Sequence, residues 1–191
     1  MRAVRIAAVL ALLSPVFAWS QESSAVSGRT VEAFAGYSLG AGGVLGTHSG
    51  FHGGVDFPLP GRLQCVGEVN RFIIGTYGTG IMSETSILVG PRYEVRLSGS
   101  GHTLVFADVL AGVDVFHNGR QSYTWIYNDG TGFALAADGG VEDRLSSHFA
   151  LRGSAGYFYG RLTNSTYGGP ANPATTGNHR ARVEISLVYR F

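Results

Sequence analysis

Residues 183–191 read VEISLVYRF, and this stretch decides the fold because its side chains alternate in polarity. In a β-strand, successive side chains point to opposite faces, so residues two apart share a face. One face of the stretch carries the apolar side chains Val183, Ile185, Leu187, Tyr189 and Phe191. The other face includes the polar side chains Glu184, Ser186 and Arg190. The stretch therefore predicts a β-strand that separates an apolar from a polar environment.

The same period of two recurs in seven segments that precede this one. They lie at about residues 30–39, 49–59, 62–75, 85–97, 103–116, 131–143 and 147–162, and the last strand begins at about residue 179. Most of them have the length that a tilted membrane-spanning strand needs. We therefore predict an all-β fold, an eight-stranded antiparallel up-and-down transmembrane β-barrel. Because Pro91 donates no backbone hydrogen bond, we expect a β-bulge in the fourth segment.

The connections between these segments alternate in length. Those after the second, fourth and sixth segments are short, whereas those after the odd-numbered segments are longer. The short ones lie around Pro60, Gly99 and Asp143. Short turns at one end and long loops at the other are typical of outer-membrane barrels and would place both termini in the periplasm. In the third long connection, Tyr123, Trp125 and Tyr127 either form a partner-binding surface or extend the flanking strands beyond the bilayer.

Composition favours a barrel in a membrane and excludes several other classes. Of the 191 residues, 14% are charged, against about 25% in soluble domains. The 29 glycines suit a narrow barrel interior, which needs small side chains. A net charge of +1 gives no electrostatic basis for binding nucleic acid. The lone Cys65 excludes an internal disulfide and a four-cysteine zinc site, and the scattered histidines lack metal-ligand spacing, so we expect no cofactor.

The charged residues gather on one face of the predicted strands. We predict that this face lines the barrel interior as a charge network of Glu32, Asp56, Glu68, Arg92, Glu94, Asp108, Asp138, Arg152, Arg182, Glu184 and Arg190. The opposite face is nearly free of charge, as lipid requires. A lipocalin-type barrel in water would have the reverse arrangement. Because an eight-stranded interior leaves little room for water, we interpret the network as a fixed plug rather than a gate that opens a pore.

The first twenty residues have the organisation of a secretory signal peptide. Arg2 and Arg5 precede a short apolar run, which ends at Pro15 and is followed by small residues. The run is shorter than the ~20 residues of a spanning helix. We expect cleavage before Gln21, with cleavage after Ala18 as the alternative. The chain then consists of a signal peptide (1–20), a short N-terminal linker (21–28) and an outer-membrane β-barrel (29–191).

Several segments also resemble a known family. The stretches VEAFAGYSL (31–39), ILVGPRYEVR (87–96), FADVLAGVDV (106–115), HFALRGSAGYFYGRL (148–162) and VEISLVYRF resemble the eight-stranded outer-membrane β-barrel domain of the OmpA/OmpX and opacity-protein-like group. The resemblance implies export to the bacterial outer membrane and contact with outer-membrane lipid and lipopolysaccharide. It also implies that the barrel-assembly machinery reads a C-terminal sorting signal of Ile185, Leu187, Tyr189 and Phe191. The chain stops at the barrel, so we expect no peptidoglycan-binding domain and no wall-tethering role.

The expected function is a structural, adhesive or surface-interaction role without enzymatic activity, with an extracellular partner held by the long loops. Three alternatives stay open: a lipid-modifying outer-membrane enzyme of the same fold, a narrow porin-like pore and a periplasmic lipid-binding barrel. For the enzyme, the residue types of a nucleophile, base and orienter occur together in Asp143, Ser146, Ser147 and His148. These residues lie at a predicted turn without a supporting motif, so we interpret them as solvated turn residues.

Overall fold

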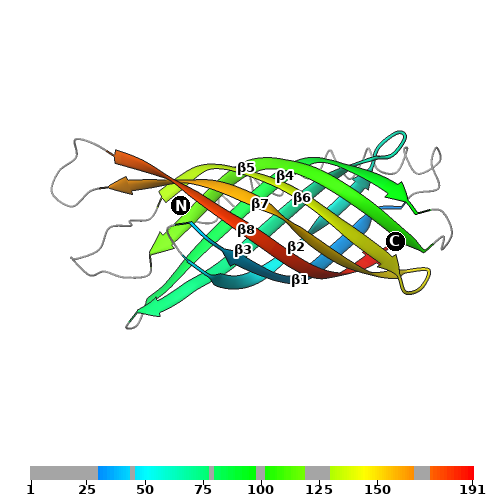
Figure 1. The fold of residues 1–191 in the computed structure, drawn as a ribbon, viewed down its shortest axis with the longest axis horizontal. Coiled ribbons are helices and arrows are strands. Elements are labelled where there is room, and N and C mark those ends of the chain that lie inside the picture. The colour runs from blue at the N-terminus through cyan, green and yellow to red at the C-terminus, as the bar shows by residue number, and fades with distance from the viewer. Residues whose placement is uncertain (1–29, 44–45, 78–79, 98–101, 119–129, 166–172) are drawn as a thin grey trace.

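The computed structural model describes residues 30–43, 46–77, 80–97, 102–118, 130–165 and 173–191. Its strands are β1 Glu32–Ala41, β2 His48–Pro58, β3 Leu63–Tyr77, β4 Gly80–Arg96, β5 Thr103–Asn118, β6 Gly130–Arg144, β7 Phe149–Ser165 and β8 Pro173–Arg190. Each strand pairs antiparallel with the next, and β8 pairs with β1 to close the barrel (Figure 1). The predicted eight-stranded antiparallel up-and-down barrel is therefore confirmed. The predicted signal peptide and linker lie outside the described residues.

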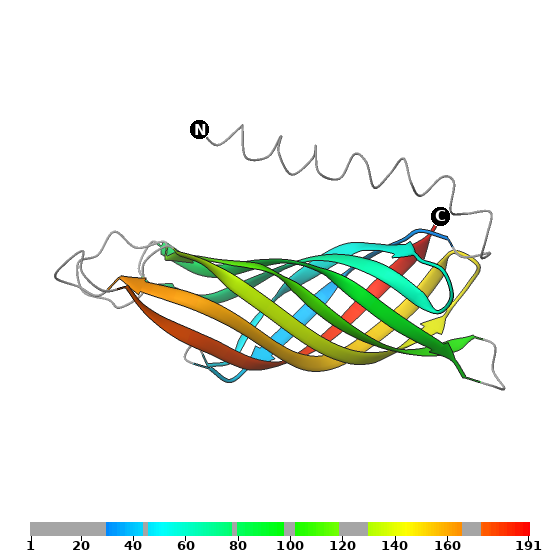
Figure 2. The ribbon, with the colours of Figure 1, turned by 90° about the horizontal axis from the view of Figure 1, so that it is seen from above.

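The strands are strongly tilted because the pairing register shifts around the barrel (Figure 2). One row of facing residues passes through every strand: Tyr189, Ala33, Val55, Gly67, Val89, Ala111, Leu135, Tyr159 and His179. Tyr189 and His179 both belong to β8, so one circuit of the barrel climbs ten residues along that strand. A stagger of this size tilts the strands by about 40° from the barrel axis. Side chains from distant parts of the sequence are thereby brought to the same height.

The outward face of the barrel is apolar along the middle of the strands. Val109 on β5 is 59% exposed and Ile185 on β8 is 54% exposed. At the end that carries the short turns, Tyr189 packs edge-on against Phe149 and Phe191, with ring centroids 5.3 and 5.1 Å apart. Aromatic side chains at strand ends are typical of the boundary between hydrocarbon and headgroups. This face is therefore suited to lipid rather than to water.

The expected β-bulge at Pro91 is wrong. Pairing between β4 and β5 is interrupted between Val89 and Arg92, but the register is the same on both sides of the gap. Pro91 also stays in register with β3. The described shift in register lies elsewhere, between Ile73 and Gly75 on β3. The missing N–H of proline therefore interrupts the ladder without inserting an extra residue.

Two strands begin five or six residues before their predicted starts. β4 begins at Gly80 rather than near residue 85, and β8 begins at Pro173 rather than near residue 179. The connection between β3 and β4 consists of residues 78–79, so the long loop predicted there is wrong. Glycine and threonine in this region, which reads GTYGTG at 75–80, carry too little contrast in polarity to reveal a strand. The other connections at this end are residues 42–47, 119–129 and 166–172, and the aromatic residues Tyr123, Trp125 and Tyr127 lie outside the described residues.

Candidate functional site

The interior of the barrel is charged, and its acids outnumber its arginines. The buried carboxyl side chains among the described residues are Glu32, Asp56, Glu68, Glu84, Glu94, Asp108, Asp114, Asp138, Glu142 and Glu184. The buried arginines are Arg92, Arg152, Arg180, Arg182 and Arg190. Isolated charges would be very costly in such an environment, so their pairing determines whether the interior is stable. The pairs form three clusters along the barrel axis.

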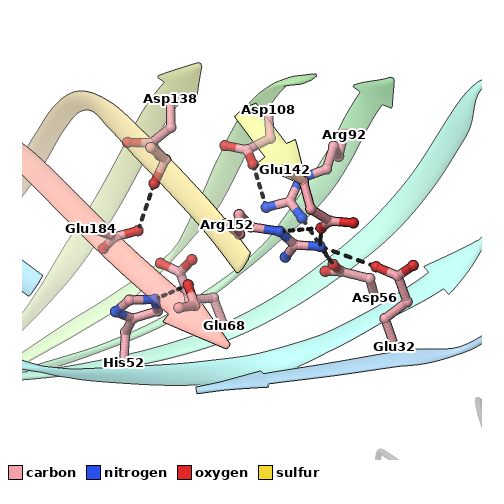
Figure 3. A network of polar contacts seen from close by, with 12 residues as sticks. Glu32, His52, Asp56, Glu68, Arg92, Asp108, Asp138, Glu142, Arg152 and Glu184 are labelled. Carbon is pink, nitrogen blue, oxygen red and sulfur yellow. Dashed lines mark hydrogen bonds and ion pairs between the residues drawn. The ribbon is translucent and has the colours of Figure 1, made fainter. Parts of the chain in front are cut away.

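The first cluster lies toward the short turns and begins with Arg92 (Figure 3). Its Nη1 donates to Asp56 Oδ2 at 2.8 Å, and its Nε and Nη2 donate to Asp108 Oδ2 at 2.9 and 2.7 Å. The guanidinium also lies over the ring of Phe106, 4.3 Å from the centroid. Arg92 and Asp108 face each other directly across the β4–β5 pair. This arginine therefore joins carboxylates of β2 and β5.

Arg152 of β7 links the same cluster to the remaining strands. Its Nη2 lies 2.7 Å from carboxylate oxygens of Asp56 and Glu142 and 3.1 Å from Glu32 Oε2. Arg190 donates to Glu32 Oε1 at 2.7 Å and also pairs with Glu142. Three arginines and four carboxylates thus share one connected network. Such alternating contacts satisfy charges that no single pair would satisfy.

The second cluster surrounds Arg182 near the middle of the barrel. Its Nε donates to Asp138 Oδ1 at 2.8 Å, and its Nη1 lies 2.8 Å from Glu68 Oε1 and 3.3 Å from Glu184 Oε1. Beside this cluster, His52 places Nε2 2.8 Å from Ser186 Oγ. One arginine therefore serves three carboxylates here, as Arg152 does in the first cluster.

Glycines allow these side chains to meet across an intervening strand. Asp138 and Arg182 both face Gly156, and a Cβ at that position would lie 2.1 Å from Asp138 Oδ1. In the same way, His52 and Ser186 both face Gly36, where a Cβ would lie 2.8 Å from His52 Cε1. A side chain at either glycine would occupy the space through which the polar contact runs.

The third cluster lies toward the opposite end and is built around Arg180. The guanidinium is held between two rings, 4.3 Å from the centroid of Phe72 and 3.9 Å from that of Phe158. Its Nη1 donates to Glu84 Oε2 at 2.5 Å. Asp114, which is also buried, lies on the neighbouring strand β5. Stacked aromatic rings and an ion pair together fill the cross-section here.

The structure places the predicted network residues Glu32, Glu68, Arg92, Glu94, Asp108, Asp138, Arg152, Arg182 and Glu184 inside the barrel. Asp56 and Arg190 are also inside. Sequence reasoning did not include Glu84, Asp114, Glu142 and Arg180 in the network. Glu84 precedes the predicted start of its strand, but the other three share the inward phase of their strands. Extending the alternation of inward and outward side chains along the whole of each strand would have identified these three residues.

The terminal segment proposed as a sorting signal lies on the outward face of β8 and at its end. Its four side chains Ile185, Leu187, Tyr189 and Phe191 are all exposed. β8 pairs with both β7 and β1, so this segment borders the closure of the barrel.

The residues considered for an enzyme do not form a relay. Asp143 accepts a hydrogen bond from Thr103 Oγ1 at 2.9 Å, whereas His148 contacts Ser147 Oγ through Nδ1 at 2.9 Å. Ser146 Oγ instead accepts from the backbone N–H of residues 148 and 149. The acid, the imidazole and the hydroxyls therefore serve the local turn and strand pairing, as solvated turn residues do.

The described residues also lack two other kinds of feature. They contain no group of three or more His, Cys, Asp or Glu side chains arranged to hold a metal ion. In the same part of the chain, no helix is long and apolar enough to cross a membrane. A cavity of about 40 Å³ lies at the turn end beside Glu32, Gln64 and Arg190. It has room for no more than a few water molecules.

Comparison with known proteins gives matches in structure alone. No protein-family model and no curated protein sequence matches the chain. Among solved structures, Neisserial surface protein A (NspA) is 14% identical with a TM-score of 0.60, and the match covers 86% of this chain and 98% of that one. Ail, the attachment invasion locus protein of Yersinia pestis, is 14% identical with a TM-score of 0.52, covering 85% and 99%. A second structure of Ail, in complex with the heparin analogue sucrose octasulfate, is 15% identical with a TM-score of 0.53. At these identities the likeness establishes the fold, which is that of small eight-stranded outer-membrane β-barrels.

Proposed function

We propose that this protein is a bacterial outer-membrane β-barrel with a structural, adhesive or surface-interaction role and without enzymatic activity. The observation that carries the proposal is the polarity of the wall. Val109 and Ile185 face outward and are more than half exposed, whereas Arg92, Arg152 and Arg182 are buried inside. In water this arrangement would expose a continuous apolar surface, but in a bilayer it satisfies both faces. The reversed polarity also argues against the periplasmic lipid-binding barrel.

The interior supports a plug rather than a pore. Arg92, Arg182 and Arg180 belong to three successive clusters, and each is ion-paired to at least one carboxylate. An eight-stranded barrel has an interior just wide enough for its own side chains. Moving an ion through it would require breaking several desolvated pairs in turn, at several kcal/mol for each uncompensated charge. We therefore expect no steady conductance.

A surface role follows from the ends of the strands. The connections 42–47, 78–79, 119–129 and 166–172 all join an odd-numbered strand to the next, and the strand ends that they link lie together at one end of the barrel (Figure 1). Recognition residues are often carried by loops on a rigid scaffold. Ail has been crystallised with a heparin analogue, which supports an extracellular partner for a barrel of this shape. We assign the partner-binding role to these connections and place the short turns in the periplasm.

Assembly would use the terminal strand. Ile185, Leu187, Tyr189 and Phe191 form an outward apolar row that ends in an aromatic ring. We propose that the barrel-assembly machinery reads this row after export through the inner membrane, as the family resemblance implies. The outward face of the assembled barrel then contacts the lipid and lipopolysaccharide of the outer membrane.

One experiment tests the location and the fold together. Full-length protein is expressed in a Gram-negative host, the envelope is fractionated, and outer-membrane samples are run on a detergent gel with and without boiling. We expect resistance to carbonate extraction and a shift in migration between unheated and boiled samples, because a closed barrel resists detergent unfolding. Release by carbonate together with identical migration would refute the proposal.

A second experiment tests the absence of lipid-modifying activity. Lipid A from cells with and without the protein is compared by mass spectrometry, and a modified species would establish the enzymatic alternative.

A further inference from the structure

The lipid-facing surface of the barrel is electrically asymmetric. Of the eleven described carboxyl side chains, ten are buried inside the barrel, and Asp143 lies on the outer face at the turn end. On the outward face of the described strands, the basic side chains all lie in the half away from the short turns. They are Arg71, His117, Arg161 and His179. This half of the outer wall therefore presents basic groups to its surroundings.

Two of these basic side chains lie together on β7 and β8. Arg161 faces Gly177 across the β7–β8 ladder, and His179, two residues further along β8, faces Tyr159. The His179 ring lies 4.9 Å from the ring of Tyr159, and its Nδ1 is hydrogen-bonded to the hydroxyl of Tyr157. Arg161, His179 and Tyr157 are exposed, and Tyr159 is half-buried. We call these four residues the β7–β8 basic patch.

The orientation of the imidazole gives the patch a second directed donor. When the Tyr157 hydroxyl donates to Nδ1, the proton of the neutral ring resides on Nε2. A Cβ at Gly177 would lie 2.9 Å from this Nε2, so the nitrogen is directed over the glycine. Gly177 is also the residue that faces Arg161. No side chain at position 177 therefore separates the imidazole donor from the position of the guanidinium.

The height of the patch matches the far boundary of a membrane. His179 and Tyr189 lie on the same strand, ten residues apart, and belong to the row that makes one circuit of the barrel. Ten residues at about 3.3 Å each, tilted by about 40°, span about 25 Å along the barrel axis. This is about the height of the apolar band of an outer-membrane barrel. With Tyr189 at the periplasmic boundary, His179 lies where the headgroups of the outer leaflet begin.

We propose that the β7–β8 basic patch binds the phosphate of a phosphorylated lipid in the outer leaflet. The inference rests on the proposed membrane location and adds a ligand chemistry to it. The planar guanidinium of Arg161 matches phosphate geometry, and Nε2 of His179 supplies a second donor. Tyr157 and Tyr159 provide the amphipathic rings that such a boundary favours. A lipid is favoured over a water-soluble phosphate because the patch opens onto the same outward face as the apolar row that includes Val183 and Ile185.

The test uses the full chain folded in detergent and measures lipid binding by native mass spectrometry. The ligands are diphosphoryl lipid A, enzymatically dephosphorylated lipid A and inorganic phosphate. The variants are Arg161→Gln, His179→Gln and the double substitution, with Arg71→Gln as control because it removes an outward arginine of the same half on β3. We expect wild type and Arg71→Gln to prefer the phosphorylated lipid. Loss of two charge-assisted contacts should weaken binding of that lipid to the double variant by about tenfold or more.

Equal binding of the two lipids by wild type would overturn the site, and so would an equal loss in Arg71→Gln. Competition by inorganic phosphate at the concentration of the lipid would instead show a free-phosphate site and reject the lipid assignment. Heat-dependent migration is recorded for every protein. A wild-type chain that shows the barrel shift but does not distinguish the lipids rejects the patch and leaves the proposed function standing. A chain without the shift rejects both.

Discussion

Asp108 and Asp138 face each other directly across the β5–β6 pair, yet each is bonded to a different arginine. Asp108 accepts from Arg92, which comes from β4, and Asp138 accepts from Arg182, which reaches across Gly156 from β8. Like charges directly opposite each other destabilise a strand pair unless something neutralises them. The two aspartates therefore mark the boundary at which the first cluster passes into the second.

Arg182 is the common partner of all three carboxylates in the second cluster, so its removal should be costly. Arg182→Met should preserve much of the side-chain volume but leave Glu68, Asp138 and Glu184 without their common partner. We expect the free energy of unfolding to fall by roughly 3–5 kcal/mol, because uncompensated buried charges remain. Urea titration in detergent, followed by the gel-migration shift, measures the change. The exposed turn variant Arg62→Met should stay within about 0.5 kcal/mol of wild type, and equal midpoints for both variants would contradict the assignment.

Gly156 and Gly153 form a matched pair on β7. At Gly156 a methyl group would lie 2.1 Å from Asp138 Oδ1 and 2.3 Å from the Ala137 carbonyl oxygen, whereas a Cβ at Gly153 meets nothing within 4 Å. We expect Gly156→Ala to lower the free energy of unfolding by about 1–3 kcal/mol through overpacking. Gly153→Ala should be neutral or stabilising by up to about 1 kcal/mol. Comparable urea midpoints for the two variants would show that the contact across Gly156 is unimportant.

Because the interior has three separate clusters, disrupting one of them tests whether the interior is a fixed plug or a gate. Arg180→Ala removes the cation between Phe72 and Phe158 but leaves the clusters around Arg182 and Arg92 in place. We expect this variant, like wild type, to carry no steady ionic current in planar bilayers, since the first and second clusters still fill the lumen. Steady, cation-selective current in Arg180→Ala alone would identify the third cluster as a gate. Steady current in wild type would reject the plug itself.

The proposed sorting role of Phe191 has a control at the same end of the barrel. Phe191 and Phe149 are both exposed, and both pack edge-on against Tyr189. We expect Phe191→Ala to reduce the assembled outer-membrane fraction several-fold, with unfolded protein accumulating in the periplasm. Phe149→Ala should assemble normally, because it belongs to a different strand. Quantitative immunoblots of heat-shifted and unshifted protein decide the matter, and equal assembly of both variants would exclude a specific signal at Phe191.

The faces of the strands could be predicted from the sequence, but the partners inside could not. Alternation is a local property, so the inward phase of Asp108 or Arg182 follows from neighbouring residues alone. Pairing depends on the ten-residue stagger, which no local pattern reveals. Arg152 thus reaches Glu32 across 120 residues of sequence. The start of β4 could not be predicted for another reason, because glycine and threonine differ little in polarity. Glu84 lies in this unpredicted part of the strand and was therefore not included in the predicted network.

The contact between Glu32 and Arg190 belongs to the first and last strands, which meet only when the cylinder is complete. Until then, Arg190 still has Glu142 of β6 as a partner, but Glu32 lacks both of its arginines, because Arg152 and Arg190 lie on β7 and β8. A half-built sheet in hydrocarbon would therefore hold an unpaired anion at its first edge. The seam thus favours a nearly all-or-none passage into the bilayer, with neutralisation of Glu32 as its final step.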